Sequence, residues 1–139
     1  MQKLYTATAT ASGGRDGHVS SSDGVLNLDV RMPKELAGPG GSFTNPEQLF
    51  AAGYAACFDS ALQMVARMKR IKVEATAVTA HISIGKEADG GFGLAAVLEV
   101  KVDGVAPEIA KELVDAAHQV CPYSKATRGN MEVQLNVVN

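Results

Sequence analysis

The sequence predicts an α+β fold in which antiparallel or mixed sheets pack on two main helices. Three observations support this prediction. Short alternating segments separated by glycine-rich turns predict strands, and one long apolar segment with helical spacing predicts a central helix. A second amphipathic segment near the C-terminal end predicts another helix. The predicted order along the chain is β-β-β-α-β-β-α-β.

Three strands are predicted before the central helix, at residues 3–12, 18–22 and 25–31. The first two are separated by a Gly-Gly-Arg-Asp-Gly turn at residues 13–17. Asp23-Gly24 separates the second from the third and is a dipeptide typical of hairpins. Residues 33–42 hold several glycines and prolines and predict a loop.

The central helix has the clearest start signal in the chain. Asn45 can cap it, Pro46 suits the first helical position, and Gln48 stands where a capping box requires a glutamine or glutamate. Apolar residues then recur at steps of three and four to about Arg70, and the opposite side has little charge, so we expect burial on several sides. Gly53, flanked by alanines, predicts close approach of another backbone.

The remainder of the chain predicts two strands, a helix and a final strand. The strands cover residues 78–84 and 92–102, and the turn between them contains Asp89-Gly90-Gly91. The second helix opens at Pro107, runs through Val120 and is ended by Cys121-Pro122. Residues 132–138 alternate as the last strand.

The composition predicts one globular domain covering residues 1–139. Hydrophobic residues make up 46% of the chain and charged residues 20%, which excludes a disordered chain. The net charge of −2 and the lack of a basic stripe argue against a nucleic-acid partner. Met1–Tyr5 lacks the apolar core of a signal peptide, and no segment approaches 18 apolar residues. A cytoplasmic protein without a membrane partner is therefore expected.

The two cysteines, Cys57 and Cys121, are candidates for chemistry. In a reducing compartment a permanent disulfide is not expected, which leaves redox chemistry, metal binding or plain burial. Their spacing resembles neither a CxxC pair nor a zinc pattern. Cys57 lies in the middle of the predicted central helix, where an inert core residue is the ordinary alternative. Cys121 lies at a helix end, where a resolving partner could move without breaking the helix.

A reactive thiol in apolar surroundings needs a nearby cation to become a thiolate. Arg15, in its glycine-rich turn, is the best candidate, although a solvated turn arginine is the ordinary alternative. Glu47 lies in the first turn of the central helix, where the helix dipole alone would also favour a carboxylate. The three histidines do not cluster in the sequence, so no metal is predicted.

Three segments together resemble a known family. Residues 45–58, Asn-Pro-Glu-Gln-Leu-Phe-Ala-Ala-Gly-Tyr-Ala-Ala-Cys-Phe, resemble the central helix of the OsmC/Ohr superfamily. Residues 120–130, Val-Cys-Pro-Tyr-Ser-Lys-Ala-Thr-Arg-Gly-Asn, resemble the second cysteine motif of its organic hydroperoxide resistance (Ohr) branch. The turn at residues 13–17 is similar to the arginine turn of the family. The resemblance covers essentially the whole chain.

The resemblance implies an OsmC-like fold and an intertwined homodimer with a long buried central helix in each subunit. It implies a thiol peroxidase that reduces organic hydroperoxides and protects against peroxide stress. Cys57 would be the peroxidatic cysteine, Cys121 the resolving cysteine, and Arg15 with Glu47 the activating pair. It also implies no bound cofactor, with an external dithiol, dihydrolipoyl groups carried on proteins, as the reductant instead of thioredoxin.

Other functions remain open at this point. One is a structural or small-molecule-binding protein with two inert cysteines, and another is a redox sensor, although no output surface such as a basic helix is evident. A closer alternative is the osmotically inducible branch of the same superfamily. Apolar residues near Cys57 favour alkyl or lipid hydroperoxides over hydrogen peroxide as substrates.

Helix geometry adds an expectation about the dimer. Glu47 and Cys57 are ten residues apart on one predicted helix, which separates them by about 15 Å along the axis and about 80° around it. One Arg15 side chain can hardly reach both within one chain. We therefore expect the second subunit to supply part of the activating set.

Overall fold

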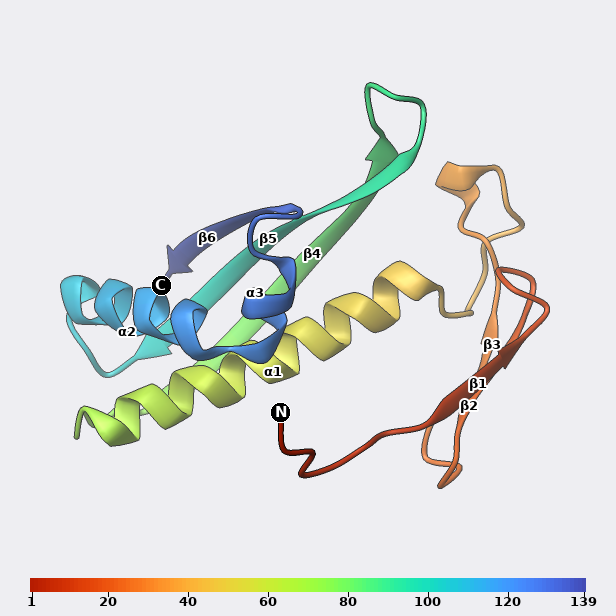
Figure 1. Ribbon diagram of the computed structural model, residues 1–139. Helices are drawn as coiled ribbons and strands as arrows, with labels where there is room; N and C mark the ends of the chain where they lie inside the picture. The colour runs from red at the N-terminus through yellow and green to blue at the C-terminus, as the bar shows by residue number, and fades with distance from the viewer. The chain divides into compact units, whose positions relative to one another are not determined.

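The structure is a computed structural model that describes residues 1–139. Its contacts divide the chain into two compact units, Met1–Leu49 and Phe50–Asn139 (Figure 1). The expectation of a single domain over residues 1–139 stays a prediction, whereas the predicted α+β class is confirmed.

The first unit is built on a small antiparallel sheet in the order β1-β2-β3. The strands are β1 (Ala9–Ser12), β2 (Gly17–Ser21) and β3 (Asn27–Val30). A short 3₁₀ helix, η1 (Lys34–Leu36), lies in the predicted loop. Val30 and Thr44 are the two buried residues of this unit, so it has almost no core.

The predicted first strand, residues 3–12, is shorter in the structure. Only Ala9–Ser12 pair with β2, because β2 ends at Ser21, the partner of Ala9. Leu4 and Tyr5 are almost fully exposed. The Ser22 amide still donates to the Thr8 carbonyl at 2.9 Å. An alternating segment forms a strand only where another strand can satisfy its backbone, and this chain provides no such strand for residues 3–7.

The second unit contains a three-stranded mixed sheet in the order β4-β5-β6. β4 (Ala75–Lys86) and β5 (Phe92–Asp103) form an antiparallel hairpin over twelve pairs from Ala75↔Asp103 to Lys86↔Phe92. β6 (Glu132–Val138) runs parallel to β5. The parallel pairing requires a crossover connection, which the intervening helices supply.

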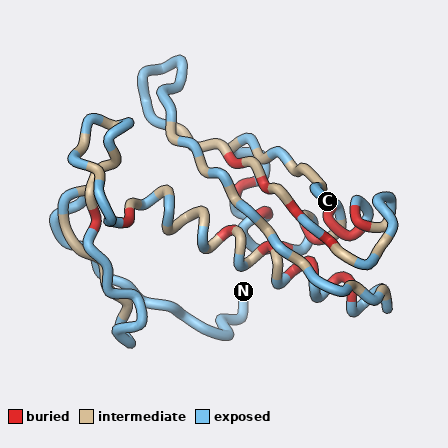
Figure 2. Tube along the Cα trace, turned by 180° about the vertical axis from the view of Figure 1, so that it is seen from behind, coloured by how far each residue is buried: buried red, intermediate tan, exposed pale blue.

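Helices cover one face of this sheet. They are α1 (Pro46–Met68), α2 (Pro107–Val120) and α3 (Pro122–Thr127). The fully buried residues of β5, Leu98 and Val100, pack with Leu62 of α1 and Leu113 of α2 in one core. Figure 2 shows these buried residues in red, running along β5 and along the helices.

α1 ends at Met68, close to the end predicted near Arg70, but it is more apolar than the sequence analysis expected. By length and composition alone it could cross a membrane, with a mean hydropathy of 1.3 over an 18-residue window. Core helices of soluble proteins pass the same test, and six residues of α1 are buried in this unit. Its other side, including Ala52, Ala56 and Met64, is exposed in the single chain, so the expected burial on several sides is not met there.

α3 is an element that the sequence reading missed. Cys121-Pro122 looked like the end of a helix, and α2 does end at Val120 as predicted. However, proline is also favoured at the first position of a new helix, because the amide that it lacks would have no helical partner there. α3 therefore begins at Pro122, directly after a single extended residue, Cys121.

Candidate active site

The two cysteines lie in contact in the second unit. Both are free thiols, and the Sγ of Cys121 lies 3.6 Å from the Sγ of Cys57. Cys57 is half-buried and Cys121 is fully buried. The C-terminal end of α2 therefore lies beside the middle of α1, as a peroxidatic and a resolving cysteine require. Two thiols at this distance can form a disulfide with little backbone movement.

Cys57 is positioned by the middle of α1, in surroundings that disfavour a thiolate. Burial raises the pKa of its thiol, and the neighbouring Cys121 raises it further. A hydrogen bond with the backbone of Tyr123 opposes these effects and lowers the pKa, without reversing the net rise. Within its own unit, therefore, Cys57 is a poorly activated nucleophile at neutral pH.

Cys121 is the single residue between two helices. Its φ of −62° and ψ of 122° are extended, and it serves both as C-cap of α2 and as N-cap of α3. Its amide N–H donates to the carbonyl of Ala117 at 2.8 Å, and its carbonyl accepts from the amide of Lys125 at 3.0 Å. The position of its sulfur therefore depends on how α2 and α3 are held together.

Gly53 admits an aromatic side chain close to α1. A Cβ at this position would lie 2.9 Å from the Oη of Tyr123 and 3.2 Å from its ring. The expected close approach at Gly53 is therefore made by the Tyr123 side chain and not by another backbone. Phe50 and Tyr54 complete the aromatic cluster, with ring centroids 6.2 and 5.8 Å from that of Tyr123.

Arg15 and Glu47 form a two-pronged ion pair in the first unit. Arg15 Nη1 donates to Glu47 Oε2 at 2.8 Å, and Nη2 donates to Oε1 at 2.5 Å. These hydrogen bonds lower the pKa of Glu47 and raise that of Arg15, so both groups remain charged. The predicted cap next to them is confirmed, because Asn45 Oδ1 accepts from the amide of Gln48 at 2.8 Å.

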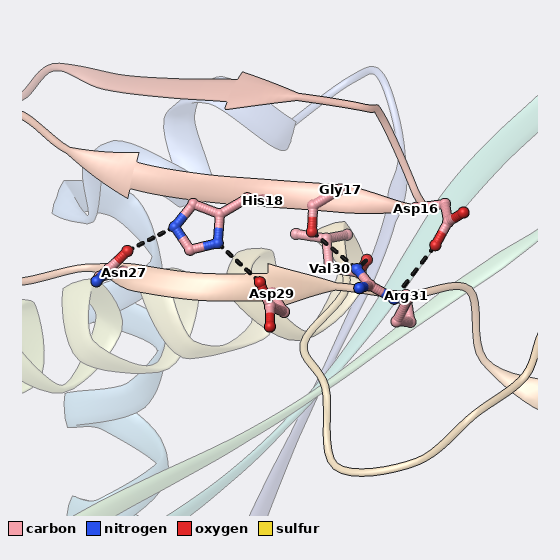
Figure 3. Close-up of polar contacts among 7 residues, drawn as sticks. All are labelled: Asp16, Gly17, His18, Asn27, Asp29, Val30 and Arg31. Carbon is pink, nitrogen blue, oxygen red and sulfur yellow. Dashed lines mark hydrogen bonds and ion pairs between the residues drawn. The ribbon is translucent and has the colours of Figure 1, made fainter.

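The turn that carries Arg15 is tight and is braced by Arg31, the residue that follows β3. Gly13 has a φ of +76°, and a Cβ at Gly17 would lie 1.8 Å from the carbonyl oxygen of Ser12, so both positions require glycine. Arg31 donates to the Gly17 carbonyl at 2.9 Å and pairs with Asp16 at 3.2 Å (Figure 3). Sequence reasoning gave Arg31 no role, because nothing in its own segment marks it.

A buried polar network, also missed from the sequence, lies beside the cysteines. Tyr54 Oη lies 3.0 Å from Ser124 Oγ and 3.2 Å from Thr127 Oγ1, and His118 Nδ1 lies 2.9 Å from Ser124 Oγ. Tyr54 and Ser124 are completely buried. Burial lowers the pKa of His118.

The other two histidines make separate surface contacts. His18 bridges Asp29 at 2.9 Å and Asn27 across two strands (Figure 3), and His81 lies 3.3 Å from Glu99. No group of three or more His, Cys, Asp or Glu side chains is arranged to hold a metal ion.

Comparisons with family models, known sequences and solved structures all indicate the same family. The family model described as OsmC-like protein matches residues 38–136. Organic hydroperoxide resistance protein OhrA of Bacillus subtilis is 59% identical, over 98% of this chain and 97% of the relative. A crystal structure of an organic hydroperoxide resistance protein from Elizabethkingia anophelis has a TM-score of 0.95 at 55% identity, covering 100% of this chain and 99% of that one. The crystal structure of OhrB of Bacillus subtilis has a TM-score of 0.91 at 50% identity, covering 98% and 100%.

Proposed function

The chain belongs to the OsmC-like family and to its organic hydroperoxide resistance branch, and from this premise we propose that it is a cysteine-based peroxidase for organic hydroperoxides. Membership of this branch gives it a role in resistance to organic hydroperoxides, as part of a stress response. The observation that carries the catalytic proposal is the 3.6 Å contact between the sulfurs of Cys57 and Cys121. We also propose a cytoplasmic location, where the thiols would stay reduced between turnovers.

In the first step, Cys57 is the peroxidatic cysteine. Its thiolate attacks the terminal oxygen of the hydroperoxide, an S–O bond forms and the O–O bond breaks. Cys57 becomes a sulfenic acid, so its sulfur is oxidised by two electrons, and the leaving alkoxide takes a proton to become an alcohol. The apolar and aromatic surroundings of Cys57, including Phe50 and Tyr123, support an alkyl or lipid chain on the substrate.

In the second step, Cys121 is the resolving cysteine. Its sulfur attacks the sulfenic sulfur of Cys57, the S–S bond forms, the S–O bond breaks and water leaves with the thiol proton of Cys121. The disulfide then exchanges with an external dithiol, which is oxidised as both thiols are restored. We propose protein-bound dihydrolipoyl groups as this reductant, by resemblance to the family, with no bound cofactor or metal in the enzyme.

Activation of Cys57 requires a cation, because its own unit raises the thiol pKa. We propose Arg15 for this role. Its guanidinium presents several donors in one plane, which suits both a thiolate and the charge that develops on the leaving alkoxide. Glu47 would orient Arg15 through the two-pronged pair, which is formed within one chain.

The arrangement of these residues favours a homodimeric site. Glu47 and Cys57 are ten residues apart on α1, about 15 Å along the helix axis. Because Arg15 is already bound to Glu47 of its own chain, we propose that the Arg15–Glu47 pair of one subunit activates Cys57 of its partner. The exposed small residues of α1, Ala52 and Ala56, would permit close packing of two such helices.

Steady-state turnover tests this proposal. Purified protein is given cumene hydroperoxide, a lipid hydroperoxide or hydrogen peroxide, with either dihydrolipoamide or thioredoxin as reductant. We expect turnover with dihydrolipoamide and a kcat/KM for the organic substrates well above that for hydrogen peroxide. Equal values for all peroxides would refute a selective apolar site, and no peroxide consumption by the fully reduced protein would leave the cysteines as inert core residues.

A further inference from the structure

We infer that Ser124, together with His118 and Tyr54, positions Cys121 for the resolving step. This inference rests on the proposed function, since it concerns how the disulfide forms after Cys57 has been oxidised. In this role the three residues do not themselves react. They act through the helices that carry Cys57 and Cys121.

The first link bridges the break at Cys121. His118 lies three residues before Cys121, in the last turn of α2, and Ser124 lies three residues after it, in α3. The 2.9 Å contact between His118 Nδ1 and Ser124 Oγ therefore ties the two helices on either side of the cysteine. Arg128 adds a second tie, since its Nη2 donates to the carbonyl of His118.

The second link joins α3 to the helix that carries Cys57. Tyr54 lies three residues before Cys57, so both side chains project from neighbouring positions on one side of α1. The Tyr54 hydroxyl reaches Ser124 at 3.0 Å and Thr127 at 3.2 Å. Ser124 is thus the common member of both links, one within the α2–α3 junction and one to α1.

The hydroxyl groups of the network can all be satisfied at once. The Thr127 hydroxyl donates to the carbonyls of Tyr123 and Ser124, which leaves its oxygen free to accept from Tyr54. Tyr54 can then accept from Ser124, and Ser124 from His118 Nδ1. A buried hydroxyl costs free energy unless it is paired, so this chain of bonds favours one arrangement of α3.

The arrangement matters because the resolving step competes with further oxidation. The sulfurs start 3.6 Å apart and must close to about 2 Å to bond. Holding them at this separation gives Cys121 a high effective concentration at the sulfenic acid. If α3 could swing about Cys121, the sulfenic acid would survive longer and a second hydroperoxide could convert it to sulfinic acid.

The test separates the two chemical steps. Rapid mixing with cumene hydroperoxide measures the rate of Cys57 oxidation and the rate of disulfide formation, and mass spectrometry measures sulfinic acid. For Ser124→Ala we expect the oxidation rate to stay within about twofold and disulfide formation to slow about tenfold, the factor associated with one lost hydrogen bond. The sulfinic fraction should rise accordingly.

Matched variants distinguish positioning from general loss of stability. Val114→Ala truncates a buried residue of α2 outside the network, and it should leave the ratio of the two rates unchanged although it destabilises the fold. His118→Asn, whose amide can occupy the place of Nδ1, should restore most of the disulfide rate that His118→Ala loses. Tyr54→Phe removes one hydroxyl while keeping the ring, and it provides the measurement should Ser124→Ala fail to fold.

Failure of this inference and failure of the proposed function would give different results. A wild-type disulfide rate in folded Ser124→Ala, or an equal slowing in Val114→Ala, would overturn the inference while leaving the proposed function intact. Absence of any sulfenic acid or disulfide in the wild-type protein would instead refute the proposed function itself.

Discussion

The two compact units differ sharply in how they are held together. Phe50–Asn139 contains a core of α1, α2 and the β4-β5-β6 sheet, with residues such as Leu62, Leu98 and Leu113 completely buried. Met1–Leu49 has only Val30 and Thr44 buried, and leaves Leu4, Val25 and Phe43 exposed. A sheet of three short strands without a packed face is marginal by itself.

Because of this difference, the two cysteines lie in a unit with a buried core, whereas the Arg15–Glu47 pair lies in a unit that has almost none. The cysteines belong to the unit with the core, which fixes their separation but raises the pKa of Cys57. Arg15 and Glu47 belong to the unit without a core, where they form a two-pronged ion pair. The proposed chemistry needs the thiols of Phe50–Asn139 and the ion pair of Met1–Leu49, and each can be perturbed separately.

The largest effect on activity is expected at Cys57, in the unit Phe50–Asn139. Cys57→Ser should abolish peroxide reduction, because a serine hydroxyl at neutral pH is no comparable nucleophile. Cys121→Ser should instead consume one equivalent of peroxide and then stall as a sulfenic acid or become over-oxidised. Single-turnover peroxide consumption measures both variants. Equal consumption by the two would reverse or void the assignment of roles.

A smaller but still large effect on activity is expected at Arg15, in the unit Met1–Leu49. Arg15→Ala should lower kcat/KM about 10²-fold, through loss of charge stabilisation in the transition state. It should also raise the pKa of the Cys57 thiol, so the pH profile of its alkylation should move to higher pH. Arg15→Lys keeps the charge but loses the two-pronged geometry, and should be intermediate.

Arg67→Ala is the matched control for Arg15→Ala, because Arg67 is an exposed arginine in the last turn of α1. It should change neither kcat/KM nor the alkylation profile. An unchanged alkylation profile in Arg15→Ala would show that Arg15 does not activate the Cys57 thiol.

Subunit exchange tests whether the Arg15–Glu47 pair of one subunit activates Cys57 of the other. Cys57→Ser and Glu47→Ala proteins are mixed and allowed to exchange subunits. If Glu47 of one chain serves Cys57 of the other, the mixed dimer has one site with both defects and one intact site. Activity should then recover to at most about half of wild type, since one of two sites works. No recovery despite verified heterodimers would indicate a site built within one chain.

The smallest effect is expected on thermal stability, at the exposed pair of His18 and Asp29 in the unit Met1–Leu49. Its hydrogen bond with Asp29 raises the pKa of His18 above its ordinary value of 6.5, and His18 in turn lowers the pKa of Asp29. The stabilisation from His18 is therefore complete below pH 6.5 and is lost as the pH rises through the raised value. His18→Gln should flatten a slight fall in thermal stability across that range, without a change in activity. A steeper fall would contradict this sign.

Much of the fold followed from local patterns. The bounds of α2 and β6 are those predicted, and the Asn45 cap and the Asp23-Gly24 hairpin lie where their residues indicated. These features depend on residues a few positions apart. The extent of β1 did not follow, because it depends on where β2 stops offering partners.

The candidate site divides in the same way. The meeting of Cys57 and Cys121 was predicted through the resemblance, but the Tyr54–Ser124 contact joins residues 70 positions apart and has no local signal. Tyr54 was read as one member of an apolar stripe, which its burial supports, and its hydroxyl partner could only be found in three dimensions. The role of Arg31 in bracing the Arg15 turn was hidden for the same reason.

The long separation of the two touching sulfurs has a consequence for the unfolded chain. Cys57 and Cys121 are 64 positions apart, so a bond between them would close a large loop in the denatured ensemble. The loss of chain entropy in that ensemble corresponds to about 4 kcal/mol of added stability in the chain-entropy description. Each turn of the proposed cycle would therefore alternate between a form that melts more easily and one that resists melting.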